Sequence, residues 1–185
     1  MAVALRVKLN YDDLLLFPND GKRHELIDGE HLMSPSPRTH HQTASLNLAA
    51  LLLAFVRKHK RGRIFTAPVD VCFSDWDVVV PDIVFIARER VRLITLEHIR
   101  GAPDLIVEIL SPSTSEVDRK MKFKLYEKYG VREYWILDPD DECVEIFTLR
   151  AGGYKLLKRF MRGQKARSEV LTGFICAVDD IFAVG

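Results

Sequence analysis

The clearest hydrophobic pattern in the chain is residues 105–110, a run that is apolar except for Glu108. The run consists of Val, Ile and Leu and lies between Pro103 and Pro112, which predicts a buried strand. An ionised Glu in such a strand loses its hydration, and this is costly unless a metal ion or a cationic side chain compensates the charge. Glu108 is therefore expected either to hold a cation or to form a structural ion pair.

Apolar positions at helical spacing predict three helices. The longest is expected over residues 39–60, and the residues on its buried face are His41, Ala44, Leu48, Leu52 and Phe55. A second helix follows the buried strand and is rich in lysine; its expected buried stripe is Val117, Met121, Leu125 and Tyr129, and Gly130 is a suitable C′ residue. Asn10 can cap a short helix that begins at Tyr11 and ends before Pro18.

Apolar runs between turn residues predict the strands. Residues 23–30 form a hairpin around Asp28-Gly29, with Glu25 on the first strand. Gly62 is expected to end the long helix, and the next expected strands cover residues 63–67, 70–73 and 78–87, the last of which carries Asp82. A meander follows over 133–137, 144–149 and 154–160, and residues 171–182 form a packed terminal segment. With no repeat or linker, residues 1–185 are predicted to form a single α/β domain.

Composition narrows the functional classes only slightly. The 185 residues are 48% hydrophobic and 29% charged, with a net charge of +1, which is typical of a soluble globular protein. Affinity for nucleic acid would therefore have to come from a local basic face. The best candidates for phosphate contacts are Arg57, Lys58, Lys60 and Arg61, although cations at a helix C-terminus also suit the helix dipole.

The cysteines and the apolar segments indicate a cytoplasmic protein. Cys72, Cys143 and Cys176 are odd in number and have no CxxC spacing, which favours reduced buried thiols over disulfides or a zinc site. The longest apolar run, residues 46–56, is too short to span a membrane. The N-terminus lacks a signal-peptide cleavage pattern.

Two Pro-Asp pairs supply carboxylates that could join Glu108. Asp104 lies on the same strand, ~13 Å from Glu108 at about 3.3 Å per residue, so the two cannot share one ion. Asp82 begins one strand and Glu108 lies late in the other, so antiparallel pairing would bring these two carboxylates together. Asp104 would then lie at the opposite end, capping a turn beside Pro103.

Carboxylates that converge beside a lysine suit Mg²⁺ or Mn²⁺, which prefer oxygen ligands. Such an ion can activate a water for attack on phosphorus, and a lysine can stabilise the transition state. Lys120 points away from the expected buried stripe, whereas Lys122 and Lys124 flank it on opposite sides, so spacing leaves these two open. An i,i+4 pair of Lys122 with Asp118 is the simplest structural alternative.

At this point the sequence resembles the Uma-type, restriction-endonuclease-like family of the PD-(D/E)XK nuclease superfamily. The likeness extends from about residue 11 to residue 182. The motifs that carry it are RHELIDGE at 23–30, Ser34-Pro35 followed by His41-Gln42, Pro81-Asp82, APDLIVEILSPST at 102–114 and DRKMKFKLYEKYGVREYWILDP at 118–139. Together these motifs are specific for the family, whereas a single Pro-Asp pair is not.

The resemblance implies a mixed β-sheet flanked by helices, a divalent-metal site and a homodimer. It implies that Asp82 is the motif aspartate, Glu108 the motif acid and Glu25 an additional acidic residue. The chain departs from the superfamily pattern at Leu110, where the parent motif has lysine. In this family the lysine lies in the following helix, and Lys122 matches that position.

Each candidate also has a structural interpretation. Asp82 could bond backbone amides at a strand entry, Glu108 could pair with Lys122, and Glu25 could be a cross-strand charge partner. His41 could be a satisfied core or capping histidine, although like Ser111 it borders the expected site. Ser111 and Thr114 are expected to form the turn and cap the lysine helix. The aromatic residues are expected in the core or a dimer interface: Tyr126, Tyr129, Tyr134 and Trp135.

The leading hypothesis is a Mg²⁺-dependent endonuclease acting on DNA. Asp82, Glu108 and the backbone carbonyl of Ile109 would hold the metal with support from Glu25, and Lys122 would assist the attacking water. The alternative is a catalytically silent, dimeric binding or regulatory module on the nuclease scaffold, favoured by the near-neutral charge and the displaced lysine. A hydrolase of smaller phosphate esters is a third hypothesis.

Overall fold

A computed structural model describes residues 7–112 and 115–184, and its centre is a six-stranded sheet in the order β11-β10-β9-β8-β6-β3. β8 pairs antiparallel with β6 and parallel with β9, so the sheet is mixed, as predicted. The strands are β3 (Gly62–Thr66), β6 (Ile83–Ala87), β8 (Leu105–Ile109), β9 (Glu133–Asp138), β10 (Cys143–Arg150) and β11 (Gly153–Met161). The predicted meander is β9, β10 and β11.

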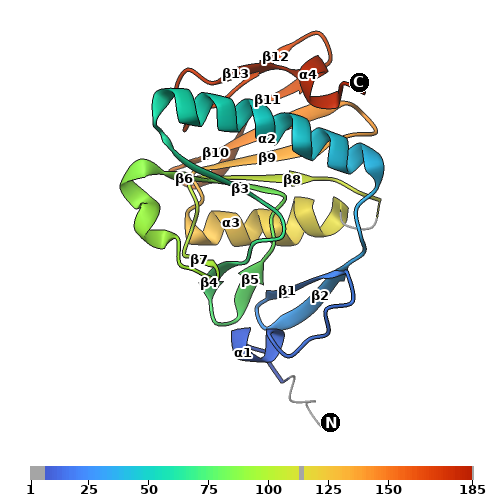
Figure 1. The fold of residues 1–185 in the computed structure, drawn as a ribbon, viewed down its shortest axis with the longest axis vertical. Coiled ribbons are helices and arrows are strands. Elements are labelled where there is room, and N and C mark those ends of the chain that lie inside the picture. Colours follow the sequence, from blue (N-terminus) through green and yellow to red (C-terminus); the bar gives the residue numbers. More distant parts are fainter. Residues whose placement is uncertain (1–6, 113–114, 185) are drawn as a thin grey trace.

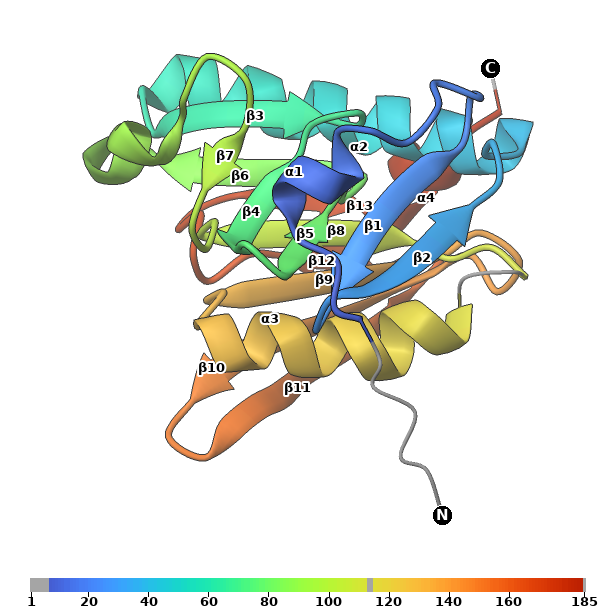
Figure 2. The ribbon, with the colours of Figure 1, turned by 90° about the horizontal axis from the view of Figure 1, so that it is seen from below.

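Helices cover both faces of this sheet (Figure 1). On one face lie α2 (Thr39–His59) and α4 (Val178–Phe182), whereas α3 (Phe123–Tyr129) lies on the other; Figure 2 shows α2 and α3 on opposite sides of the strands. Val107 of β8 packs in the cluster that contains Leu48 of α2, and Ile106 packs in the cluster that contains Leu125 of α3. Because side chains alternate along a strand, Glu108 has the parity of Ile106 and belongs to the α3 face.

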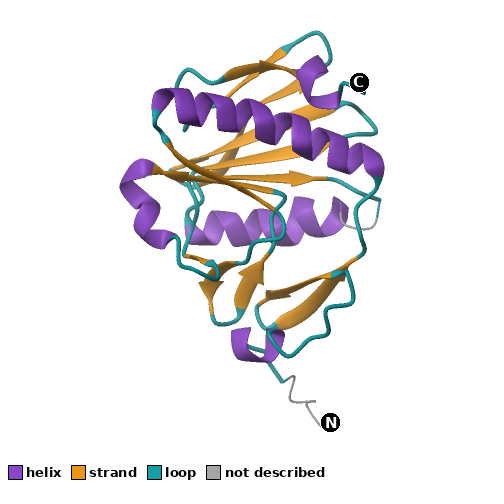
Figure 3. Cartoon of the chain, in the orientation of Figure 1, coloured by secondary structure: helices purple, strands orange, loops and turns teal. Residues whose placement is uncertain are grey.

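A second, five-stranded sheet lies beside the first, in the order β2-β1-β5-β4-β7 (Figure 3). Its elements, with the capped helix α1 (Tyr11–Leu14) nearby, are β1 (Arg23–Ile27), β2 (Glu30–Ser34), β4 (Val71–Ser74), β5 (Asp77–Val79) and β7 (Ile99–Arg100). A 3₁₀ helix, Arg88–Leu93, precedes β7. A small sheet pairs β12 (Lys165–Arg167) with β13 (Ile175–Ala177), and β13 with α4 makes up much of the packed C-terminal segment.

The single strand predicted over residues 78–87 is wrong, because this segment is two strands in two different sheets. β5 ends at Val79 in the five-stranded sheet and β6 begins at Ile83 in the six-stranded sheet. Pro81 lies between them and cannot donate a backbone hydrogen bond, so the ladder is interrupted there. This break carries the chain from one sheet to the other and places Asp82 at the junction.

The predicted hairpin at 23–30 is confirmed. β1 and β2 pair antiparallel, and the turn residues Asp28 and Gly29 have φ values of 53° and 73°. Positive φ at both central residues is the requirement of a type I′ turn, which Asp-Gly satisfies. Glu25 lies in the middle of β1, where the hairpin directs it towards the six-stranded sheet.

The long helix begins at Thr39 as predicted and ends at His59, where Lys60 adopts a left-handed C-cap conformation. Gly62 therefore does not end the helix. Gly62 opens β3, and a Cβ at this position would lie 2.0 Å from the carbonyl oxygen of Ile86. Among the helices of the described residues, none is long and apolar enough to cross a membrane.

The lysine-rich helix starts with a π-helical segment, Val117–Lys122, and continues as α3 to the left-handed C-cap Gly130. The predicted buried stripe was wrong in part. Leu125 is buried, but Val117, Met121 and Tyr129 are only partly buried, and the fully buried stripe is Asp118, Lys122, Leu125 and Tyr126. Charged residues occupy this stripe because they neutralise one another. Thr114, predicted to cap the helix, lies outside the described residues.

Candidate active site

A pocket of about 340 Å³ opens where the hairpin, the start of α2, the ends of β6 and β8 and the π-helical segment meet. Asp82 lies just before β6, β8 supplies Glu108, β1 supplies Arg23 and Glu25, α2 supplies His41, and the π-helical segment supplies Lys122. Ile83 pairs with Val107 across the antiparallel strands, so Asp82 and Glu108 lie at the same end of the sheet. The pairing predicted from the sequence is therefore present.

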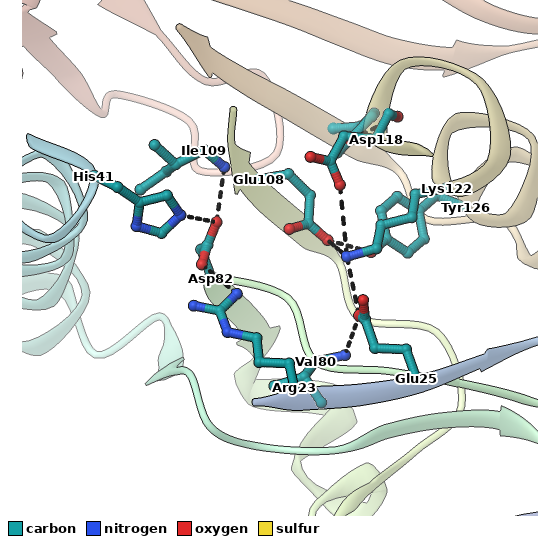
Figure 4. A network of polar contacts seen from close by, with 11 residues as sticks. Arg23, Glu25, His41, Val80, Asp82, Glu108, Ile109, Asp118, Lys122 and Tyr126 are labelled. Carbon is teal, nitrogen blue, oxygen red and sulfur yellow. Dashed lines mark hydrogen bonds and ion pairs between the residues drawn. The ribbon is translucent and has the colours of Figure 1, made fainter. Parts of the chain in front are cut away.

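Lys122 is the centre of the acidic part of the pocket (Figure 4). Its Nζ lies 2.9 Å from Glu25 Oε1, 3.1 Å from Glu108 Oε1 and 3.6 Å from Asp118 Oδ1. The hydroxyl of Tyr126 donates a hydrogen bond of 2.6 Å to Glu108 Oε1. All these side chains except Tyr126 line the pocket, and all are buried. The ammonium group of Lys122 therefore neutralises part of the negative charge of three carboxylates.

The charges in this cluster change its protonation equilibria. Burial acts to lower the pKa of Lys122, but the negative charges of Glu108, Glu25 and Asp118 outweigh it, so the pKa lies well above the ordinary lysine value. Burial raises the pKa of Glu108 well above its usual range; Lys122 opposes this rise, while the nearby carboxylates add to it. Lys122 therefore remains a cation at neutral pH and serves as a donor rather than a proton acceptor.

Asp82 is held by a separate set of partners (Figure 4). Arg23 Nη1 lies 2.7 Å from Oδ1, the Ile109 N–H donates to Oδ2 at 2.8 Å, and His41 Nε2 lies 3.1 Å from Oδ2. Burial acts to raise the pKa of Asp82, but the hydrogen bond from His41 and the charge of Arg23 outweigh it and lower the pKa. Asp82 is therefore a buried carboxylate that stays ionised.

The hairpin positions both Glu25 and Arg23. Side chains two residues apart on a strand share a face, so β1 directs these two side chains into the pocket together. The backbone N–H of Val80 donates to Glu25 Oε1 at 2.7 Å, which fixes this carboxylate between the N–H and Lys122. β1 thus supplies one carboxylate to the lysine cluster and one cation to Asp82.

The structure also places three other residues that the sequence analysis considered, Ser111, Lys124 and Asp104. Ser111 lines the pocket, and Lys124 is exposed, so the geometry selects Lys122 from the two lysines that spacing left open. Asp104 lies at the opposite end of β8, where it accepts a hydrogen bond from Ala87 N–H and pairs with Arg90 and Arg132. Asp104 is thus a structural carboxylate bound to the end of β6 and two arginines.

The structure does not bring the basic residues at the end of α2 to the pocket. His41 lies near the start of this helix and Arg57 lies sixteen residues later, about 24 Å away at 1.5 Å per residue. The four exposed cations are Arg57, Lys58, Lys60 and Arg61. They could contact only a ligand long enough to extend well beyond the pocket.

Three groups in or beside the pocket were not assigned to the site from the sequence. Arg23 could have been found because it has the same strand parity as Glu25. Asp118 was recognised only as an i,i+4 partner of Lys122, a contact that is present together with the other two carboxylates. Tyr126 was expected in the core or a dimer interface and is buried in the core, but no sequence signal indicated that its hydroxyl bonds Glu108.

The chemistry of the donor set fits a hard divalent cation. Asp82 and Glu108 offer carboxylate oxygens to one pocket, with Glu25 beside them, and such ligands suit Mg²⁺ or Mn²⁺. In the present arrangement, protein cations engage these carboxylates, and the described residues contain no group of three or more His, Cys, Asp or Glu side chains positioned to hold a metal. A bound metal would therefore have to displace Arg23 or Lys122 from the carboxylates.

The fold and the pocket together define a restriction-endonuclease-like protein. The model of the family described as "Uma2: Putative restriction endonuclease" matches residues 11–179. The chain therefore belongs to this family, as its motifs predicted. None of the curated proteins compared with the chain matches it.

A solved structure supports the fold assignment. The chain is similar to a protein described as "a putative nuclease belonging to DUF820" from Anabaena variabilis, with a TM-score of 0.77 and 22% sequence identity. The similarity covers 94% of this chain and 97% of the other. At this level of identity the likeness establishes the shared fold.

Proposed function

We propose that the protein is a Mg²⁺-dependent endonuclease that hydrolyses phosphodiester bonds in DNA. The observation that carries the proposal is the meeting of Asp82, Glu108 and Lys122, from three separate elements, in one pocket of a chain of the Uma2 family. Asp82 and Glu108, with the Ile109 carbonyl, would hold the metal, and Glu25 would support it. The bound ion would supply activation of a water and stabilisation of charge on the phosphate.

The protein residues have distinct parts in this proposal. Lys122, kept protonated by its carboxylate partners, would donate a hydrogen bond to the attacking water or to a non-bridging phosphate oxygen. Tyr126 would fix the orientation of Glu108, and His41 would fix that of Asp82. A dimer would present two such pockets to the two strands of a duplex, and homodimerisation belongs to the same proposal.

The test compares two Pro-Asp pairs of the same chain. Asp82→Asn should abolish Mg²⁺-dependent cleavage of DNA, whereas Asp104→Asn should retain it, because both carboxylates are buried but only Asp82 lines the pocket. Cleavage of duplex DNA, single-stranded DNA, RNA and mononucleotide esters would be measured with the same preparations. Full cleavage by the Asp82→Asn protein would overturn the site assignment, and a preference for mononucleotide esters would overturn the substrate class.

A second candidate function is a non-catalytic module on the nuclease scaffold. The observation in its favour is that Arg23 and Lys122 already neutralise the pocket carboxylates. Calorimetric titration of the wild-type protein with Mn²⁺ separates the two functions. A nuclease of this class should take up the metal at the pocket, and a silent module with permanent ion pairs should take up none.

A further inference from the structure

The cation that engages Asp82 differs from the one that engages Glu108. Lys122 is 5% exposed and contacts three carboxylates, whereas the Arg23 side chain is 21% exposed and pairs with Asp82. A cation that is partly solvated and has one carboxylate partner is easier to displace than a buried cation with three. Arg23 is therefore the more mobile countercharge of the pocket.

The contacts of Asp82 separate its two oxygens. Oδ2 accepts from the Ile109 N–H and lies against His41, and both of these groups hold the carboxylate in position. Within the described part of the chain, Arg23 is the partner of Oδ1, at 2.7 Å. Removing Arg23 would therefore release one oxygen of Asp82 while the other oxygen remained anchored.

A divalent ion and Arg23 would compete for the position next to Oδ1. Mg²⁺ binds a carboxylate oxygen at about 2.1 Å, and a guanidinium nitrogen at hydrogen-bond distance from the same oxygen would lie in or next to its coordination shell. The two positive charges would also repel each other strongly at a separation of a few ångströms in a buried pocket. Binding of a divalent ion at Oδ1 therefore favours departure of Arg23, and the Arg23 pair disfavours binding of the ion.

We propose that Arg23 is an internal competitor of the catalytic metal: it neutralises Asp82 in the metal-free protein and must leave Oδ1 before a divalent ion can bind there. This inference rests on the metal site of the proposed function and adds to it a residue that controls metal loading. The metal-free protein is stabilised by the ion pair, and the affinity for metal is reduced by the free energy needed to break it.

The first test measures Mn²⁺ affinity by isothermal titration calorimetry. Arg23→Gln should bind Mn²⁺ about tenfold more tightly than the wild-type protein, because the metal would no longer have to displace Arg23 from Asp82; a factor of ten corresponds to about 1.4 kcal/mol. Arg38→Gln is the matched control. Arg38 lines the same pocket and is exposed, and it is not among the partners of Asp82 within the described residues. Its replacement removes the same charge without opening Oδ1.

Equal increases in Mn²⁺ affinity in the Arg23→Gln and Arg38→Gln proteins would overturn the proposal, because the effect would then come from the loss of any positive charge. An unchanged Mn²⁺ affinity in Arg23→Gln would overturn it directly. If the wild-type protein cleaves DNA with Mg²⁺ while Arg23→Gln has an unchanged Mn²⁺ affinity, the inference about Arg23 is wrong and the proposed nuclease function stands. If neither protein takes up Mn²⁺ and neither cleaves DNA, both are overturned.

A second measurement uses the wild-type protein and so does not depend on the variant folding. In ¹⁵N-labelled protein, the Arg23 guanidinium signals should show slow rotation and protected protons without metal, because Asp82 holds the group. Saturating Mg²⁺ should shift these signals and increase their exchange with water. Arg23 signals that are identical with and without saturating Mg²⁺ would contradict the inference.

Discussion

Lys122 is the residue on which the acidic cluster depends. Three carboxylates lie within 3.6 Å of its ammonium group. Because these carboxylates are buried, little water could solvate them if the ammonium group were absent. A buried pair or triad adds little net stability over an apolar equivalent, but removal of one partner leaves charges without compensation. The lysine is thus needed for the fold of the pocket as well as for the proposed chemistry.

The variant Lys122→Met tests this dependence. We expect loss of DNA cleavage and a decrease of about 3–5 kcal/mol in the free energy of unfolding, because Glu25, Glu108 and Asp118 would face each other without a cation. Lys124→Met is the control, since Lys124 is exposed on the same helix. Chemical denaturation and a cleavage assay on both proteins give the measurement. Equal stability of the two variants would show that the cluster does not need the lysine charge.

At the scale of elements, Asp77 on β5 connects the hairpin β1–β2 to the C-terminal end of α3. Asp77 accepts from the backbone N–H of Asp28 at 2.7 Å, from the Tyr129 hydroxyl at 2.6 Å and from Lys128 Nζ at 3.0 Å. These contacts connect the turn that positions Arg23 and Glu25 to the C-terminal end of the helix that begins beside Lys122. Asp77 therefore contributes to the pocket geometry without lining it.

The protonation of Asp77 gives a stability prediction that depends on pH. Burial acts to raise its pKa, but the bonds from Tyr129, Asp28 and Lys128 outweigh it and lower the pKa. A lowered folded-state pKa stabilises the fold above the unfolded-state value of about 4, and this stabilisation is lost as the pH falls through the folded-state pKa. Asp77→Asn should therefore cost about 1–2 kcal/mol at neutral pH and progressively less below about pH 4.

Urea denaturation of the wild-type and Asp77→Asn proteins at several pH values would measure this difference. Asp75→Asn serves as the control, because Asp75 lies in the adjacent turn and is exposed. A stability difference between the wild-type and Asp77→Asn proteins that does not change between neutral pH and pH 3 would contradict the assignment of Asp77 as an ionised acceptor.

At the scale of the whole molecule, α2 joins the pocket to the exposed basic cluster at its C-terminal end. His41 and Arg57 are about 24 Å apart along this helix, a length that corresponds to about seven base pairs of DNA. With a net charge of only +1, the molecule as a whole supplies little attraction for nucleic acid. DNA that reached both regions would owe much of its affinity to this local cluster.

The salt dependence of DNA binding tests whether the basic cluster at the end of α2 contacts phosphates. Replacing its four cations with alanine should weaken DNA binding and reduce the slope of log K against log salt by about 0.9 for each phosphate that is no longer neutralised. The control removes four exposed cations on and around β11 and β12, which are Lys155, Lys158, Lys165 and Arg167. Fluorescence anisotropy at several salt concentrations would measure both slopes. A larger change in the control protein would place the DNA contacts around β11 and β12 instead.

Features that depend on neighbouring residues could be predicted from the sequence alone. Asp28-Gly29 specified a hairpin turn, and the apolar run around Glu108 specified a buried strand with a charge that needed a partner. The spacing of Leu48 and Leu52 specified a helix with one buried face. These predictions succeeded because backbone preferences and side-chain periodicity act over a few residues. The family motifs added the general position of Asp82, Glu108 and Lys122 in one fold.

Which charged side chains pair with each other depends on how the elements pack in three dimensions. Pro81 breaks an apolar run that looks continuous, and the two parts enter different sheets. Arg23 reaches Asp82, 59 residues away in the sequence, while Asp118 and Glu25 converge on Lys122. Ion pairing depends on distance in space and on burial, and sequence spacing fixes neither once several elements pack together. The competition between Arg23 and a metal ion is therefore a property of the packed pocket.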